Sequence, residues 1–234
     1  MKNMTRRGFL FRVGGAAGII SFTRAGKLFS QTQQGEVEEV EVSPAEDLMR
    51  EHGVLRRVLL IYQEWIGRLR AKKYEQLDTL AESNRVIRSF VEDYHEKLEE
   101  EYLFPRFKKA GKLVDLVEVL LQQHQAGRKL TDTTLQLSNA ESLKIPDNQK
   151  RLSRSLGDFI RMYQPHAARE DTVLFPAFHE IVPAKEYDEL GDVFEKRENE
   201  LFGERGFEKM VDRVASIEKR LEIYELSRFT PRSG

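Results

Sequence analysis

The sequence contains no cysteine among its 234 residues. This absence excludes disulfide bonds, thiolate zinc sites, cysteine nucleophiles, iron–sulfur clusters and a lipoprotein anchor. Any metal bound by the chain must therefore be held by histidine and carboxylate side chains. Glycine and proline are also scarce, with 15 and 7 residues, while long stretches are rich in Leu, Glu, Lys and Arg. These features exclude a β-sandwich and predict an all-α fold.

An excess of charge of one sign is also missing, because 38 Lys and Arg stand against 39 Asp and Glu. The balance is uneven along the chain, since residues 1–30 carry six basic side chains and no acidic one. With those six removed, 32 basic residues remain against 39 acidic ones, a net charge of −7. That acidic balance argues against nucleic acid as a partner.

The N-terminal residues have the pattern of an export signal. Thr5, Arg6 and Arg7 precede Gly8 and a Phe-Leu pair, and an apolar stretch follows over 13–22. That stretch is too short to span a hydrocarbon core of about 30 Å. The segment resembles the twin-arginine signal family, which implies export of the folded protein through the twin-arginine machinery to a periplasmic or extracytoplasmic location. An amphipathic N-terminal helix or a disordered basic tail is the alternative, and an uncleaved signal would tether the protein to the membrane.

The helical spacing of apolar residues predicts four long helices and two shorter amphipathic ones. Ser43 and Glu46 form a capping box with Pro44 at the first helical position, so the first helix begins there. The second helix is expected to break at Pro105, and the last two are expected to form a lid or a dimer surface. The six helices are predicted over about 43–72, 78–109, 113–137, 146–180, 184–201 and 206–226.

A sequence repeat favours one architecture for residues 43–182. Leu-Phe-Pro-Arg-Phe at 103–107 recurs as Leu-Phe-Pro-Ala-Phe at 174–178, a shift of 71. Two helical hairpins of one design bury their apolar faces most simply as an antiparallel four-helix bundle with a pseudo-two-fold axis. The predicted domain organisation is completed by an export signal, an acidic linker and a C-terminal helical extension, over 1–30, 31–42 and 183–234.

Four of the five histidines follow the same repeat, one on each long helix. Two of them lie 71 residues apart, and the other two lie 72 residues apart. Each of the first two is followed four residues later by a glutamate, and residues i and i+4 share one face of a helix. All six side chains can therefore reach one point in the core. The candidate metal ligands are His52, His95, Glu99, His124, His166 and Glu170.

Burying these six groups without a metal would be unfavourable, because each ionised carboxylate would lose several kcal/mol of solvation. A pair of divalent or trivalent cations removes that penalty. Imidazole and carboxylate ligands without thiolate suit iron or manganese, and zinc also fits. We therefore expect two metal ions with the two carboxylates as bridges. In the alternative interpretation, each histidine is an ordinary hydrogen-bonded core or surface residue.

At these residues the chain resembles the hemerythrin-like (HHE cation-binding) family. Segments 51–52, 95–99, 123–124 and 166–170 are similar to the ligand segments of that family, and the resemblance covers 45–180. It implies a non-haem di-iron centre in a four-helix bundle, bridged by two carboxylates and an oxo or hydroxo group. It also implies that the centre binds dioxygen, peroxide or nitric oxide.

Two positions depart from the oxygen-carrying members of that family. Those members have a histidine one turn after the third-helix ligand, where this chain has Arg128. They also have a ligand carboxylate five residues after the last histidine, where this chain has Asp171. Asp171 is therefore the alternative ligand to Glu170. The coordination position left open shifts the expectation from oxygen carriage towards redox chemistry, with peroxide consumption a candidate activity. Arg128 could hydrogen-bond an anionic oxygen species and Tyr163 could donate a proton near the centre, whereas His179 is expected at the surface or behind the ligands.

Three classes of function remain open at this point. The leading one is an exported di-iron protein that binds or reduces dioxygen, peroxide or nitric oxide. A non-catalytic iron-binding or metal-binding sensor or scavenger is the alternative, and a metal-free helical interaction module is the third. The sequence does not identify the redox partner, and it is compatible with a homo-oligomer.

Overall fold

The computed structural model describes residues 42–231. All regular structure in that part of the chain is helical, and it contains no strand, so the predicted all-α class is confirmed. None of the described helices has the length and apolar character needed to cross a membrane. The predicted export signal over 1–30 and all but the last residue of the predicted linker over 31–42 lie outside the described residues.

Helix α1 spans Pro44–Arg70 and begins where the capping signal places it. The side chain of Ser43 accepts a hydrogen bond from the backbone N–H of Glu46 at 3.2 Å, which satisfies one of the free donors of the first turn. The N–H of Ala45 donates to the hydroxyl of Tyr187 at 3.2 Å. The start of α1 is therefore tied to a residue 142 positions further along the chain.

The second long helical segment runs without interruption from Asp78 to Ala110. Its consecutive parts are α2 (Asp78–Val86), the π-helix η1 (Ile87–His95), α3 (Glu96–Leu98), the π-helix η2 (Glu99–Leu103) and α4 (Phe104–Ala110). The predicted break at Pro105 is therefore wrong, and the segment ends instead at Gly111, which has the left-handed φ of 63° that glycine adopts without strain.

The two prolines of the repeated motif each follow a π-helical turn of five residues. These turns are η2 (Glu99–Leu103) and η3 (Glu170–Leu174). A proline has no N–H for the ladder, and its ring crowds the carbonyl group four residues earlier. A wider π turn makes room for that ring. The helix consequently continues through Pro105, and each π turn begins at a candidate ligand.

The second half of the repeat has the same construction. Helix α5 spans Val114–Leu137, and a short unpredicted helix, α6 (Ala140–Leu143), precedes α7 (Pro146–Arg169). After η3, helix α8 (Phe175–Ile181) completes the fourth long segment. Side chains far apart in the sequence fill the interior between these segments.

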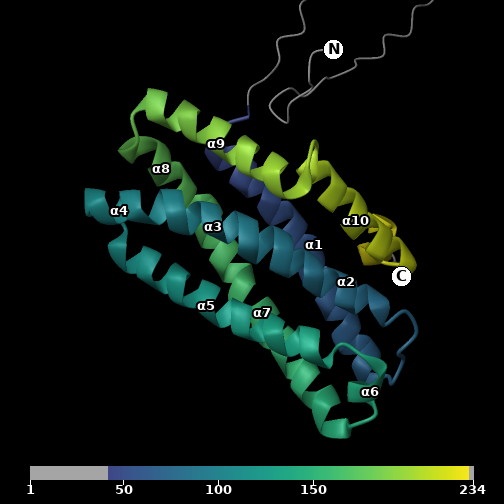
Figure 1. Ribbon diagram of the computed structural model, residues 1–234. Coiled ribbons are helices and arrows are strands. Elements are labelled where there is room, and N and C mark those ends of the chain that lie inside the picture. The colour runs from purple at the N-terminus through teal and green to yellow at the C-terminus, as the bar shows by residue number, and fades with distance from the viewer. Residues whose placement is uncertain (1–41, 232–234) are drawn as a thin grey trace, which may run out of the picture. The chain divides into compact units, whose positions relative to one another are not determined.

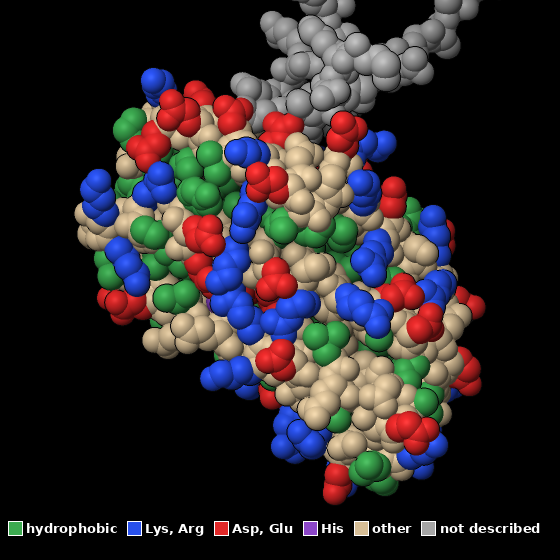
Figure 2. All heavy atoms as spheres, in the orientation of Figure 1, with side chains coloured by type: hydrophobic (Ala, Val, Ile, Leu, Met, Phe, Trp, Pro, Cys, Tyr) green, Lys and Arg blue, Asp and Glu red, His purple; other side chains and the backbone are tan. Residues whose placement is uncertain are grey.

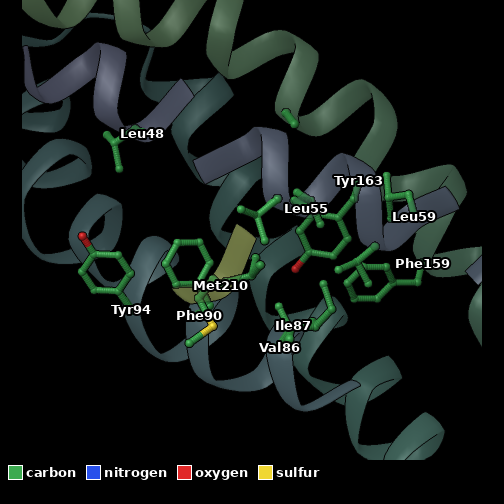
Figure 3. Close-up of a cluster of buried hydrophobic side chains, with 14 of the residues drawn as sticks. Leu48, Leu55, Leu59, Val86, Ile87, Phe90, Tyr94, Phe159, Tyr163 and Met210 are labelled. Carbon is green, nitrogen blue, oxygen red and sulfur yellow. The ribbon is translucent and has the colours of Figure 1, made fainter. Parts of the chain in front are cut away.

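The long helical segments lie side by side in a closed arrangement (Figure 1). Helix α5 packs along α7, α7 packs along α1, and α1 packs against η1 and α2, which in turn contact α5. Figure 3 shows part of the core. In that view Leu55 lies between two aromatic pairs, Phe90 with Tyr94 and Phe159 with Tyr163. All five of these side chains are buried.

The C-terminal extension packs on the outside of this arrangement. Helices α9 (Ala184–Phe202) and α10 (Gly206–Arg220) contact α1, and α10 also contacts α2 (Figure 1). Their buried apolar side chains include Leu190, Phe194 and Ile217. Helix α10 ends at Arg220 rather than near 226, and a short 3-10 helix, η4, follows over Leu226–Phe229.

Figure 2 shows one face of the described part of the chain, with acidic and basic side chains intermixed. No imidazole is visible on that face. Four of the five histidines are buried, each with 4% exposure or less. The chemistry suggested by the sequence is therefore located in the interior.

Candidate metal centre

The structure brings the six predicted side chains together in the core. His52 lies on α1, His95 at the end of η1, His124 on α5 and His166 on α7. The two glutamates begin the π turns η2 and η3, and their side chains are completely buried. Two groups of side chains have ligand atoms within 4.8 Å of one another, namely His52, His95 and Glu99, and His124, His166 and Glu170.

The imidazoles meet in two pairs through their Nε2 atoms. The Nε2 atoms of His52 and His95 are 3.0 Å apart, and those of His124 and His166 are 3.3 Å apart. Two nitrogens bound at right angles to one ion, each about 2.1 Å from it, lie about 3.0 Å apart. The spacing within each pair therefore suits two neighbouring ligands of one cation.

Each glutamate contacts both histidine pairs. Glu99 places Oε1 3.7 Å from Nε2 of His95 and Oε2 3.5 Å from Nε2 of His124. Glu170 places Oε2 3.1 Å from Nε2 of His166 and 3.3 Å from Nε2 of His52. All four oxygens of the two carboxylates are buried without a hydrogen-bond partner. Buried polar atoms in this state are rare in folded proteins, and four of them facing two imidazole pairs suit coordination of a cation.

The protonation of the two carboxylates differs because they share one enclosed space. Burial raises the pKa of Glu99 well above its usual value, and the charge of Glu170 raises it further. Burial would also raise the pKa of Glu170, but the His166 and His52 imidazoles hold that pKa well below its usual value. Without a cation, the centre therefore favours one ionised carboxylate at a time.

The outer nitrogen of every imidazole has its own acceptor. Carboxylates lie against Nδ1 of three of the rings, and an amide oxygen lies against the fourth. The pairs are His52 with Asp171 at 2.7 Å, His95 with Glu51 at 2.7 Å, His124 with Glu100 at 3.1 Å, and His166 with Gln123 at 2.8 Å. An acceptor at Nδ1 keeps the proton there and leaves Nε2 free for a metal.

These contacts assign Asp171 to the outer side of His52, whereas Glu170 faces the interior. The acceptors Glu51, Glu100 and Gln123 are absent from the sequence-based set of site residues. The repeat contained a signal for them, since Glu51 and Gln123 are 72 positions apart, and Glu100 and Asp171 are 71 apart. The histidines that they contact are related by the other shift in each case, 71 for His95 and His166 and 72 for His52 and His124.

The two equivalent imidazoles His52 and His124 have opposite pKa shifts. Burial would lower the pKa of His52, but Asp171 and Glu170 outweigh it and raise the value to about 8. For His124, burial dominates and lowers the pKa to about 4, although Glu100 opposes the shift. A metal must displace a proton from His52 at neutral pH, whereas His124 is already neutral there.

Two arginines stand behind the outer carboxylates at equivalent positions. Arg128 donates from Nη2 to Glu100 at 2.7 Å and lies 2.8 Å from a carboxylate oxygen of Glu96. Arg56, four residues after His52, donates to Asp171. The guanidinium of Arg128 is thus paired on the Nδ1 side of His124. It does not point between the two histidine pairs, as contact with a bound oxygen species would require.

The repeated Leu-Phe-Pro motif also contributes to the centre. The Phe175 ring stacks on His52 at a centroid distance of 5.4 Å, and the Phe104 ring stacks on His124 at 5.5 Å, both with an interplanar angle of 25°. Each phenylalanine comes from the opposite half of the repeat to its histidine. These rings fix the imidazole planes and exclude water from them.

Tyr163 lies beside the centre but is bonded elsewhere. Its hydroxyl donates to Glu96 at 2.5 Å, and its ring centroid is 5.2 Å from that of His166. A Cβ atom at Gly127 would lie 2.1 Å from this hydroxyl, so glycine is required there for the tyrosine to occupy its place. His179 is exposed and contacts the ring of Tyr187, which agrees with its predicted place at the surface.

The fold and this site define a class: helical proteins with a buried histidine and carboxylate centre suited to cations. The model of the hemerythrin HHE cation binding domain matches residues 43–178. The chain therefore belongs to the hemerythrin family, and the two clusters are its candidate cation sites. Uncharacterized proteins from Mycobacterium bovis and from two strains of Mycobacterium tuberculosis are each 45% identical over 231 residues, covering 97% of this chain and 91% of the relative. No solved structure gives a significant match.

Proposed function

We propose that the chain is an exported non-haem di-iron protein in which residues 43–182 form an antiparallel four-helix bundle around two ions. His52 and His95 would hold one ion, His124 and His166 would hold the other, and Glu99 and Glu170 would serve both. The observation that carries this proposal is the position of Glu99, which directs one buried oxygen to each histidine pair. A carboxylate placed in this way suits two ions better than one.

The donor set supports iron as the resident metal, with manganese or zinc as the other metals that the same ligands accept. Iron in such a site supplies one-electron redox chemistry and a Lewis-acidic position for dioxygen, peroxide or nitric oxide. The chain itself orients each ring through the acceptor at Nδ1, so that Nε2 faces the interior. Phe104 and Phe175 shield two of the rings from water.

Peroxide consumption is the activity that we favour, because this chain has Arg128 at the position where oxygen carriers have their fifth histidine ligand. The guanidinium of Arg128 is held by Glu96 and Glu100. No further imidazole of the described chain reaches the centre, since His179 lies at the surface. Coordination positions are thereby left for water or peroxide. The alternative is a sensor or scavenger that binds metal or a small molecule without turnover.

Iron analysis and peroxide decay test the proposal. After anaerobic loading, the chain should hold close to two irons, and the loaded protein should remove hydrogen peroxide faster than the metal-free form. It should not form a long-lived oxygenated adduct in air. A stable adduct together with no metal-dependent loss of peroxide would favour binding over turnover. One ion or none per chain would contradict the dinuclear site.

Export is a separate part of the proposal, supported by Arg6 and Arg7 ahead of the short apolar stretch over 13–22. Replacing both residues, Arg6→Lys with Arg7→Lys, should leave the protein in the cytoplasm. Fractionation of cells that express the two forms measures this. Arrival of the double variant in the periplasm would show that another signal directs export.

A further inference from the structure

The inner ligands of the two proposed metal positions are equivalent. Each position has two Nε2 atoms, and each is approached by both bridging glutamates. The sequence repeat relates the two sets by shifts of 71 and 72 residues. Any difference in affinity between the positions must therefore come from the residues behind the imidazoles.

The first difference lies behind His95 and His166. Nδ1 of His95 contacts a carboxylate oxygen of Glu51 at 2.7 Å, while Nδ1 of His166 contacts the amide oxygen of Gln123 at 2.8 Å. The two acceptors occupy equivalent positions and lie at similar distances from Nδ1. They differ only in that one is a carboxylate and the other an amide. A carboxylate accepts a stronger, charge-assisted hydrogen bond from Nδ1–H than an amide oxygen does. It thereby makes Nε2 a better electron-pair donor to a metal.

The second difference lies behind His52 and His124. Asp171 lies 2.7 Å from Nδ1 of His52 and, among residues 42–231, pairs with one cationic side chain besides that ring, Arg56. Glu100 lies 3.1 Å from Nδ1 of His124 and is shared between two cations, Arg128 at 2.7 Å and Lys97 at 2.5 Å. The longer contact and the two competing cations leave less negative charge for His124.

Nearby charges act in the same direction. Glu51 belongs to a buried group with Asp47 and Glu198, whose ligand atoms lie within 4.8 Å of one another. On the other side Glu96 comes no closer than 4.0 Å to Nδ1 of His124, and it accepts from Tyr163 and pairs with Arg128. Glu96 is therefore already paired with Arg128 and Tyr163 and adds little negative charge at His124.

From these contacts we infer that the two metal positions are unequal. The ion on His52 and His95 binds more tightly, and the ion on His124 and His166 is the exchangeable one. The largest single cause is that Glu51 in the first half corresponds to Gln123 in the second. This inference rests on the proposed dinuclear function. It concerns affinity and its origin in outer residues, which the six ligands alone do not determine.

Stepwise metal binding tests the inference on the full metal-free chain. Co²⁺ is titrated anaerobically at one fixed pH and followed by absorption and by calorimetry. The wild type should bind two ions in two resolved steps whose affinities differ by about 10- to 100-fold, the range typical of changes behind a metal ligand. His95→Ala should abolish the tight step, whereas His166→Ala should keep it and lose the weak one.

Reciprocal variants separate the outer residues from folding. Glu51→Gln should weaken the tight step by about 10-fold or more, and Gln123→Glu should strengthen the weak step by a similar factor. Both changes keep the size of the side chain, and a thermal melt of each variant checks that it folds.

Three outcomes are distinguishable. Two ions bound in one unresolved step, with no response to either variant, would overturn the inequality alone. Loss of the tight step in His166→Ala rather than in His95→Ala would reverse the assignment and overturn it as well. Failure to bind more than one ion in any form would overturn the proposed dinuclear function together with the inequality.

Discussion

The two halves of the repeat agree at the centre and diverge one layer away from it. Each half contributes two imidazoles, one buried glutamate and one phenylalanine that stacks on a histidine of the other half. Behind that layer, Gln123 replaces Glu51, and Ala167 stands where the first half has Glu96. The histidines and glutamates of the centre are thus the same in both halves, while the residues behind them give each half a different distribution of charge.

Glu96 illustrates this divergence. Its carboxylate is buried, accepts from Tyr163 and pairs with Arg128. The positions that correspond to Tyr163 and Gly127 in the first half are Glu92 and Leu55, so this arrangement exists only once in the repeat. Point substitutions in one half of the repeat test how the asymmetry affects metal content and stability.

The largest expected effect comes from removing an inner ligand of either half. His52→Ala should lose most of the bound iron, because it removes a ligand of the proposed tight position, whereas His166→Ala should keep about one ion per chain. Metal analysis of purified chains after anaerobic loading measures the loss. His179→Ala is the matched control, since this histidine is exposed and lies outside both clusters. An iron content near two in either ligand variant would contradict the shared centre.

The next effect concerns the close packing found only in the second half. Gly127→Ala places a Cβ atom 2.1 Å from the hydroxyl of Tyr163, so the tyrosine must move and lose its bond to Glu96. We expect a loss of about 3 kcal/mol in the free energy of unfolding, the upper part of the range for overpacked cores. Chemical denaturation measures it.

Gly67→Ala is the control for this change. No atom lies within 4 Å of a Cβ atom built at Gly67, which is exposed on α1, so the substitution should gain up to about 1 kcal/mol through helix propensity. Equal effects of the two alanines would show that Tyr163 is not held as described.

A smaller effect is expected in the pH dependence of the metal-free protein, where His52 and His124 act in opposite directions. The folded-state pKa of His52, about 8, lies above its ordinary value of 6.5. The folded state therefore binds the extra proton, and about 2 kcal/mol of stability present below pH 6.5 is lost as the pH rises through 8.

For His124 the sign is reversed, because its folded-state pKa of about 4 lies below 6.5. The unfolded chain binds that proton more readily, so stability should rise with pH between about 4 and 6.5. Unfolding midpoints measured across this range should pass through a maximum. Asp171→Asn should flatten the alkaline limb, and His124→Gln should flatten the acidic limb. A maximum unchanged by both variants would contradict these assignments.

Much of the fold and the inner centre follows from local sequence patterns. The cap at Ser43 and Pro44 places the start of α1, and the scarcity of glycine and proline gives the helical class. The spacing of His95 to Glu99 and of His166 to Glu170 is four residues, which directs each pair to one side of a helix. Together with the repeat, these patterns bring the right six side chains to one place.

Local patterns fail where the neighbouring helix decides the outcome. A proline at position 105 predicts a break, but the π turn before it leaves the helix intact. Arg128, one turn after His124, suggests a residue that reaches the bound molecule, yet Glu96 and Glu100 hold it on the far side of the ring. Both outcomes depend on helix geometry and on partners that the spacing along one helix does not contain.

The sequence by itself determined the helical class, the duplication and the identity of the inner side chains, because periodicity and repeat spacing are properties of the chain alone. Tertiary structure decided which carboxylate faces the interior and which lies behind an imidazole. Asp171 reaches His52 and Glu100 reaches His124, each across the two halves of the repeat. Such contacts depend on the rotation and axial position of helices that are distant in sequence, and only the packed core fixes those.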